Sequence, residues 1–313
     1  MVVLNSKFVI PCDYGDAVSA LHVTEEYITC GTLLGRVWLY NIASNSRVLL
    51  AGFSDDSVRG VYIEDGTVFA TIGDQYCRRF RINDPVDQLE SKFDRRSSSS
   101  GFKYVLQKFN QVTIVYPGMT TFVDVTNNQQ SMCPYKIQQP LILNVCPLDA
   151  FQYLLLLSEF PSVEEDEDVV SKRKLKVVDV SQNTTIFEMM APRISFAILL
   201  DATRIMYVSN RKTHVYDFIR NELAECKISG EIIAASVSGE EGIVTSLFPN
   251  GSISVWDSNT GSIMGRGRID NFCGSLGFPY LIESCLAGPN YLVTVSSDYG
   301  VHFVNIANNS ISV

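Results

Sequence analysis

Short runs of apolar residues recur along the chain, and each run ends in a large apolar residue followed by a polar or charged one. These pairs lie 38 to 55 residues apart, 44 on average. In chain order they are Tyr40-Asn41, Phe80-Arg81, Val123-Asp124, Val178-Asp179, Tyr216-Asp217, Trp256-Asp257 and Val304-Asn305. A repeat of this length is typical of one four-stranded propeller blade. The pattern therefore predicts seven blades.

The residues around each pair indicate strands that are buried on both faces. The position before the pair's first residue is apolar in six copies, and Arg79 is the exception. The position two residues after it is also apolar in six copies, with Ser258 as the exception. Sheets that are covered on both sides have inner strands with apolar residues on both faces. We expect the pairs to end the third strand of each blade.

A second column of residues predicts the turns and the second strands. Six residues before each pair lies a turn position, followed by Gly35, Gly118 and Gly251 in three copies. Upstream of the turns are runs typical of strands. These runs are Tyr27 to Thr32, Thr67 to Ile72, Gln111 to Tyr116, Gln152 to Ser158, Arg204 to Ser209, Gly242 to Phe248 and Tyr291 to Ser297.

Together these patterns predict an all-β fold, a seven-bladed β-propeller of four-stranded antiparallel blades. Residues 1–313 would form a single domain. After the last predicted third strand, only Ile311 to Val313 remain to form an outer strand, and three residues are too few for one. Lys7 to Ile10 is a spare strand at the other end of the chain. We therefore expect the N-terminal strand to complete the seventh blade and close the ring.

Composition narrows the range of partners. The net charge is −9, which argues against nucleic acid because phosphate binding requires clustered basic residues. Eight cysteines occur without any C-x-x-C pair, so we expect reduced core thiols. The first residues lack a basic leader and a long apolar core, and no apolar run is long enough to cross a bilayer. These features predict a cytoplasmic protein that is neither secreted nor membrane-spanning, with the nucleus as the alternative compartment.

The array of pairs, with the literal Trp256-Asp257 and the close substitute Tyr216-Asp217, resembles the WD40 repeat family over essentially the whole chain. The Gly-His dipeptide that usually opens such a repeat is absent, so the family's relay of Asp, His, Ser or Thr and Trp cannot be assembled in the usual way. The resemblance implies a scaffold that binds proteins or peptides on its top face, bottom face or rim. It implies no catalysis.

Catalytic and cofactor chemistry find no support among the motifs. The chain has three histidines, no phosphate-binding glycine loop and no metal-ligand spacing, so we expect no cofactor, no metal and no small-molecule substrate. His214 and His302 occupy one column, but that column is polar in general.

Arg79 interrupts the apolar column, within a strand that also carries Arg78 and Arg81. A buried guanidinium requires partners. One interpretation is an ion pair with Asp74, Asp84 or Asp87, or a bulge that turns Arg79 outward. The other is an anion-binding site formed by Arg78, Arg79 and Arg81. The adjacent arginines are similar to the Phe-Arg-Arg-Gly motif of phosphoinositide-binding propellers, although here they precede Phe80 and lack the glycine.

Two insertions lie in loops that the WD40 pattern places on the top face. The first carries Arg95 and Arg96, followed by serines among which Ser97 and Ser98 suit kinases that prefer basic sites. The second carries Ser162, a further candidate for phosphorylation, followed by an acidic run. The like charges of this run would repel one another, keep the loop out of the core and steer a basic partner. The acidic run consists of Glu164, Glu165, Asp166, Glu167 and Asp168. Solvated loops without a partner are the alternative for both.

The sequence therefore predicts a non-enzymatic scaffold or adaptor that binds protein or peptide partners on the top face within a multiprotein complex. The partner-binding residues would be Arg95, Arg96 and the acidic run 164–168. The alternative is a peripheral membrane adaptor that binds phosphoinositide through the arginines at positions 78, 79 and 81. The net negative charge counts against this alternative.

Overall fold

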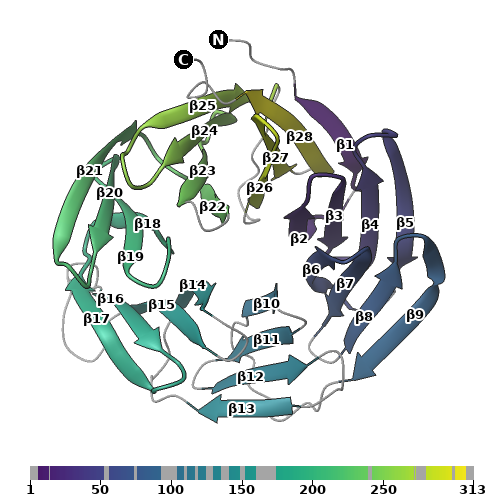
Figure 1. The fold of residues 1–313 in the computed structure, drawn as a ribbon, viewed down its shortest axis with the longest axis horizontal. Helices are drawn as coiled ribbons and strands as arrows, with labels where there is room; N and C mark the ends of the chain where they lie inside the picture. Colours follow the sequence, from purple (N-terminus) through teal and green to yellow (C-terminus); the bar gives the residue numbers. More distant parts are fainter. Residues whose placement is uncertain are drawn as a thin grey trace. The chain divides into compact units, whose positions relative to one another are not determined.

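The structure is a computed structural model. It describes residues 6–13, 15–52, 56–73, 76–92, 104–108, 111–116, 119–124, 130–134, 141–148, 152–159, 174–238, 242–270, 272, 280–297 and 300–307. All of the regular secondary structure in these residues consists of β-strands, which form seven four-stranded antiparallel sheets (Figure 1). The all-β prediction is confirmed. The chain divides into two compact units, residues 1–94 with 231–313 and residues 95–230.

The first unit contains four sheets. The first of them consists of β2 (Val18–Val23), β3 (Tyr27–Thr32), β4 (Arg36–Asn41) and β5 (Ser46–Gly52). The next consists of β6 (Val58–Glu64), β7 (Thr67–Ile72), β8 (Tyr76–Arg81) and β9 (Asp84–Lys92). A third consists of β22 (Ala234–Ser238), β23 (Ile243–Leu247), β24 (Ser252–Asp257) and β25 (Ile263–Arg268). The last consists of β26 (Ile282–Ala287), β27 (Asn290–Ser297), β28 (Gly300–Ala307) and β1 (Lys7–Pro11).

The second unit contains three sheets, each with its strands in chain order. The first consists of β10 (Tyr104–Lys108), β11 (Gln111–Tyr116), β12 (Met119–Asp124) and β13 (Gln130–Pro134). The second consists of β14 (Leu141–Pro147), β15 (Tyr153–Glu159), β16 (Lys174–Asp179) and β17 (Thr184–Met190). The third consists of β18 (Ile194–Leu199), β19 (Arg204–Ser209), β20 (Lys212–Asp217) and β21 (Glu222–Ser229).

The repeated pairs end the third strand of the sheets, as the sequence predicts. Strands β4, β8, β12, β16, β20 and β24 all end at the second residue of their pair, and β28 continues to Ala307, two residues beyond its pair. The predicted second strands agree with the observed ones within one residue at each end. The apolar columns therefore reported the strands and their limits correctly.

Neighbouring sheets of the first unit pack through the two faces of their inner strands. On one face of β4, Val37 and Leu39 contact a cluster that includes Val68 and Phe80 of the next sheet. On the other face, Tyr40 packs in a cluster with residues of β1, β27 and β28. Because successive side chains of a strand alternate between faces, a strand packed in this way needs apolar residues at nearly every position.

The N-terminal strand completes the last sheet, which confirms that part of the prediction. β1 pairs antiparallel with β28, with Lys7 opposite Phe303 and Pro11 opposite Gly300. Ile10 is fully buried and Val9 nearly so. Gly300 has a φ of 135°, and a Cβ there would collide with the carbonyl oxygen of Ile10. The close approach of the two ends of the chain therefore requires a glycine at this position.

Trp256, the aromatic member of the literal Trp-Asp pair, is fully buried. Its indole Nε1 donates a hydrogen bond to the Ser246 hydroxyl on β23, at 3.0 Å. A buried indole N–H needs such a partner. The bond stays within one sheet, and it fixes the third strand to the second.

Six of the cysteines are described as free thiols, and three of them are buried. Burial raises the pKa of Cys285 to about 11 and that of Cys226 to about 11. The reduced state of the cysteines stays a prediction.

His22 of β2 links two inner strands of the first unit. Its Nδ1 accepts a hydrogen bond from the Ile63 amide of β6 at 3.3 Å, and its ring lies 4.4 Å from that of Tyr62. Burial lowers the pKa of His22 from 6.5 to about 4. The unfolded chain thus binds a proton at a higher pH than the folded one. The stability that His22 contributes is present above about pH 6.5 and is lost as the pH falls towards 4.

Glu283 of β26 has the opposite effect. It shares a face of its strand with Cys285, which packs against the cluster formed with the sheet β2–β5. Burial raises the pKa of Glu283 from 4.5 to about 8. The folded protein therefore keeps this carboxyl group protonated at pH values where the unfolded chain has lost the proton. The corresponding stability is present below about pH 4.5 and is lost as the pH rises through 8.

Deletion of residues 1–11 is expected to lower the melting temperature by roughly 10 °C or more, because it removes two buried side chains and leaves the edge of β28 unpaired. Circular dichroism during heating measures this. Phe8→Ser is the matched control, since the Phe8 side chain is 46% exposed. An unchanged melting temperature in the deletion would show that β1 does not support the fold.

Glu283→Gln is expected to increase stability above pH 8, where the native side chain must ionise in a half-buried position, and to change it little at pH 5. The gain should approach about 1.4 kcal/mol for each pKa unit by which burial shifts the group. Urea unfolding at both pH values measures it, with Glu222→Gln on exposed β21 as control. Equal gains at the two pH values would contradict this assignment.

Candidate partner-binding surface

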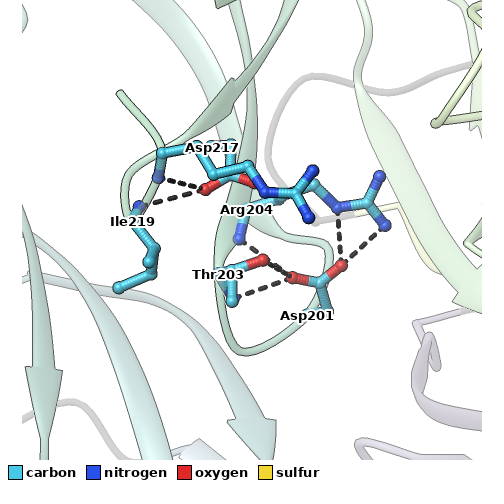
Figure 2. Close-up of polar contacts among 6 residues, drawn as sticks. Asp201, Thr203, Arg204, Asp217 and Ile219 are labelled. Carbon is cyan, nitrogen blue, oxygen red and sulfur yellow. Dashed lines mark hydrogen bonds and ion pairs between the residues drawn. The ribbon is translucent and has the colours of Figure 1, made fainter. Parts of the chain in front are cut away.

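Two polar turns meet at one end of the sheet β18–β21. One turn, residues 200–203, connects β18 with β19, and the other, residues 218–221, connects β20 with β21. The Phe218 amide donates to the carbonyl oxygen of Thr203 at 2.9 Å and so joins the turns. This end of the sheet is shown in Figure 2.

Asp201 organises the first turn. Its Oδ1 accepts hydrogen bonds from the amides of Thr203 and Arg204, at 2.8 and 2.9 Å, and its Oδ2 accepts one from Arg204 Nε at 2.7 Å (Figure 2). Burial acts to raise the pKa of Asp201, but the bonds from Thr203 and Arg204 outweigh it and hold the pKa below its usual value. Asp201 is therefore a carboxylate, and it fixes the end of the first turn by binding the amides of Thr203 and Arg204.

Asp217, the polar member of the repeated pair, organises the second turn. Its Oδ1 accepts from the amides of Ile219 and Arg220, at 3.0 and 2.8 Å. The equivalent residues do the same in other sheets: Asp179 accepts from Ser181 and Gln182, Asp257 from Asn259, and Asn41 from Ser44. The column of Asp and Asn in the sequence is thus a column of turn-capping side chains.

Tyr216 and Asn221 lock the same hairpin. The Tyr216 hydroxyl donates to Asn221 Oδ1 at 2.5 Å, and Asn221 has a φ of 59°. Asparagine tolerates this left-handed conformation better than most residues. The hairpin between β4 and β5 has the same pair, with the Tyr40 hydroxyl 2.6 Å from Asn45 Oδ1.

This rigid hairpin presents large apolar side chains to solvent. Ile219 is 66% exposed and Leu223 is 58% exposed, the two highest values for large hydrophobic residues in the described part of the chain. In Figure 2 the Ile219 side chain points away from the Asp201–Arg204 pair. Leu223 lies opposite Tyr216 in the strand register.

Half-buried aromatic rings extend the apolar surface. The ring of Phe187 on β17 lies 5.2 Å from that of Tyr216 and 5.4 Å from that of Phe218. We call this surface the hairpin patch, consisting of Ile219 and Leu223 with Phe187, Tyr216 and Phe218 beside them. Exposed apolar side chains on a fixed backbone are typical of protein-binding surfaces, because little conformational freedom is lost on binding.

The sequence interpretation missed the hairpin patch, although a signal was present. Ile219 occupies a turn position where the equivalent residues are Ala43, Ser181 and Asn259. A large aliphatic side chain in a tight surface turn has no role in packing the sheets. Comparing the turn columns as closely as the strand columns would have revealed it.

The three arginines of β8 do not gather on one face. Arg78 shares a face with Phe80, which packs towards the sheet β2–β5, whereas Arg79 and Arg81 lie on the opposite face. Arg79 is half-buried and continues a regular ladder opposite Phe69 and Leu89, so no bulge turns it outward. Its Nε is buried without a hydrogen-bond partner, and none of the described residues forms an ion pair with it.

The two histidines of the polar column lie in different units. The ring of His214 stacks on Tyr207 at 5.0 Å, and His302 Nε2 lies 3.1 Å from the Ser297 hydroxyl. Burial lowers the pKa of His302. In the described residues, no three His, Cys, Asp or Glu side chains gather closely enough to hold a metal ion.

The inserted loops fall outside the described residues. This applies to Arg95, Arg96, Ser97 and Ser98 of the first loop and to Ser162 and the acidic run 164–168 of the second. Their assignment to partner binding and phosphorylation stays a prediction. No helix in the described part of the chain has the length and apolar character needed to span a membrane.

No family model and no curated protein matches this chain. Among solved structures it is similar to one described as the computationally designed Ika8 protein, with a TM-score of 0.56 and 13% sequence identity. The similarity covers 94% of this chain and 97% of the designed protein. At this level of identity it concerns the fold alone, and it is consistent with a propeller-like arrangement of sheets.

Asp217→Ala is expected to lower the free energy of unfolding by about 1 to 2 kcal/mol, because two turn amides lose their acceptor. Asp217→Asn should cost much less, since Asn41 already caps the equivalent turn between β4 and β5. Urea unfolding followed by fluorescence compares the two variants. Equal losses would show that the charge of Asp217, and not its capping oxygen, supports the hairpin.

Proposed function

We propose that this protein is a non-enzymatic scaffold that binds segments of other proteins, and that the hairpin patch is one of its docking surfaces. The observation that carries the proposal is that, among the described residues, the two most exposed large hydrophobic side chains lie in the same hairpin. Side chains of this size usually lie inside a protein, and a cluster of them on the surface is a mark of an interaction site. The capping bonds of Asp217 and the Tyr216–Asn221 bond keep the hairpin in one conformation.

We also propose that the seven sheets are the blades of one closed propeller. Support comes from the seven copies of the repeat, from the equal size of the sheets, and from the completion of the last sheet by β1. Closure would leave hairpins and loops as the variable surface. Partner binding at a turn such as residues 218–221 fits this arrangement.

The phosphoinositide alternative has less support than protein binding. A multivalent anion such as a phosphorylated headgroup is best bound by several cations that converge on it. The alternation of β8 separates Arg78 from Arg79 and Arg81. The net charge of −9 also opposes approach to an anionic membrane.

A photo-crosslinking residue at position 219 tests the proposed function, with position 186 as the matched site. Ile186 lies on the outer strand β17 and is 38% exposed. We expect a protein partner to crosslink at position 219 and to co-purify stoichiometrically with the intact chain.

The Ile219→Ser, Leu223→Ser double variant should lose that partner, at a cost of about 2 to 4 kcal/mol in binding, whereas Ile186→Ser should retain it. The substitutions replace exposed side chains, so folding is expected to be preserved and circular dichroism checks it. Equal recovery of partners by both variants would rule out the hairpin patch as a docking surface.

A further inference from the structure

The outer strand β25 carries two arginines on one face and two glycines on the other. Arg266 and Arg268 are exposed, and neither forms a hydrogen bond or an ion pair in the part of the chain that the structure describes. Gly265 and Gly267 lie on the opposite face, because successive residues of a strand alternate between its two faces. Both positive charges therefore point to the same side of β25.

The neighbouring strand β28 requires the two glycines. A Cβ at position 265 would lie 2.6 Å from Ile306 Cγ2, and a Cβ at position 267 would lie 2.9 Å from Ile306 Cδ1. Only glycine permits so close an approach. Ile306 is 2% exposed and belongs to the core cluster that the two sheets share. This packing fixes the backbone of β25 and leaves the opposite face of the strand to the arginines.

The described neighbours of the arginines do not neutralise their charge. In the strand register, Ser254 of β24 lies opposite Arg266, and Ser252 lies opposite Arg268. Residues that lie opposite one another in an antiparallel pair share a face, so these neighbours are hydroxyl groups. Asp270 is exposed two residues beyond Arg268 but forms no ion pair with it. The two guanidinium groups are therefore open to an anion from outside the sheet.

The open edge of the sheet belongs to the same two arginines. β25 is the last strand of its sheet, and β24 is its only hydrogen-bonded neighbour among the described strands (Figure 1). Just beyond β25, the Ile269 amide donates to the Gly251 carbonyl at 2.9 Å, in the same register as the strands. Hydrogen-bonded pairs alternate along an antiparallel ladder. Positions 265 and 267 therefore bond to β24, and the backbone amides and carbonyls of Arg266 and Arg268 point to the open edge.

We propose that β25 binds an extended segment of a partner protein with acidic residues at alternate positions, which adds to the sheet as a fifth strand antiparallel to β25. Two acidic residues of the segment then lie directly opposite Arg266 and Arg268. Their side chains project to the same face as the guanidinium groups, and their backbones form the hydrogen bonds that the open edge lacks. This surface goes beyond the proposed function, because it lies in a different sheet from the hairpin patch and selects its partner by charge.

The charge of the edge determines which segment can bind. Basic residues on an edge strand oppose pairing with neutral or basic segments, which protects the edge from aggregation. An acidic segment turns the same charges into attraction, and the alternate spacing is required because adjacent side chains point to opposite faces. The net charge of −9 opposes an acidic partner only at long range. At physiological salt, charges more than about 8 Å apart are largely screened, so the two arginines dominate at contact.

The probe is the fluorescent peptide Thr-Thr-Glu-Val-Glu-Thr-Thr, whose glutamates lie at alternate positions. Its control, Thr-Thr-Glu-Glu-Val-Thr-Thr, has the same composition, but its glutamates point to opposite faces of a strand. Fluorescence anisotropy measures binding to the full-length protein. We expect the alternating peptide to bind about threefold more tightly than the control, because the control loses one of the two charge pairs. Raising the salt from about 0.05 to 0.5 M should weaken it.

Methylation of the peptide nitrogens tests the fifth strand separately from the charges. The amides of both glutamates would donate to the carbonyls of Arg266 and Arg268, whereas the valine amide would point away from β25. Methylation at the glutamates should therefore abolish binding, and methylation at the valine should preserve it.

The double variant Arg266→Gln, Arg268→Gln keeps the length of both side chains and removes their charges. It should weaken binding of the alternating peptide about tenfold, because both charge pairs are lost. Arg47→Gln is the matched control, since Arg47 is exposed on the outer strand β5 but has no second arginine two residues away. It should leave binding unchanged. Circular dichroism checks that these exposed substitutions preserve the fold. Arg266→Glu with Arg268→Glu should instead bind Thr-Thr-Lys-Val-Lys-Thr-Thr, which the native protein should reject.

Three results would overturn the inference. The first is that the alternating peptide does not bind at about 1 mM. The second is that the two peptides bind equally, or that methylation at the glutamates has no effect, since the segment then does not add as a strand. The third is that Arg47→Gln weakens binding as much as the double variant, since surface charge in general then binds the peptide. The crosslinking result at position 219 decides the proposed function independently, because that residue lies in another sheet.

Discussion

The packing of sheets on both faces of their inner strands is the constraint on which the rest of this structure depends. Strand β4 shows it directly, since Leu39 contacts one neighbouring sheet and Tyr40 the other. A strand in this position can carry few polar groups, because a buried polar group without a partner destabilises the fold. Polar side chains on the inner strands therefore need partners, as Ser246 has in the Trp256 indole and His22 has in the Ile63 amide.

The same constraint explains why the fold could be predicted from the sequence. Apolar residues at fixed positions near the end of the third strands produce columns that are visible without an alignment, and the repeated pairs mark where six of the seven strands stop. The pairing of β1 with β28 was also predictable, because the chain end lacks an outer strand and Lys7 to Ile10 supplies one. The seven copies of the repeat do not determine how the sheets of the two units are placed relative to one another.

The sequence interpretation directed attention to other residues than the hairpin patch, for reasons that are also physical. Attention to clustered charges led to Arg78, Arg79 and Arg81, but period-2 alternation places Arg78 on the other face of β8 from the other two. The hairpin patch has no charge signature. It depends on Ile219 and Leu223 being exposed, and a sequence pattern does not distinguish an exposed aliphatic residue from a buried one unless the turn position is recognised. The Asp of the repeated pair was visible as a motif, whereas its capping role required the positions of the turn amides.

The sheet that joins the two ends of the chain has a consequence for biosynthesis. At about 5 to 20 residues per second, a ribosome needs on the order of tens of seconds to pass from Lys7 to Gly300. During that time β1 has no strand to pair with, although its apolar residues Val9 and Ile10 are already outside the ribosome. The last sheet is assembled from contacts nearly 300 residues apart in sequence, the kind of contact that slows folding. In the cell, the nascent chain therefore carries an unpaired, apolar β1 until β28 has been synthesised, and chaperones have this interval in which to bind it.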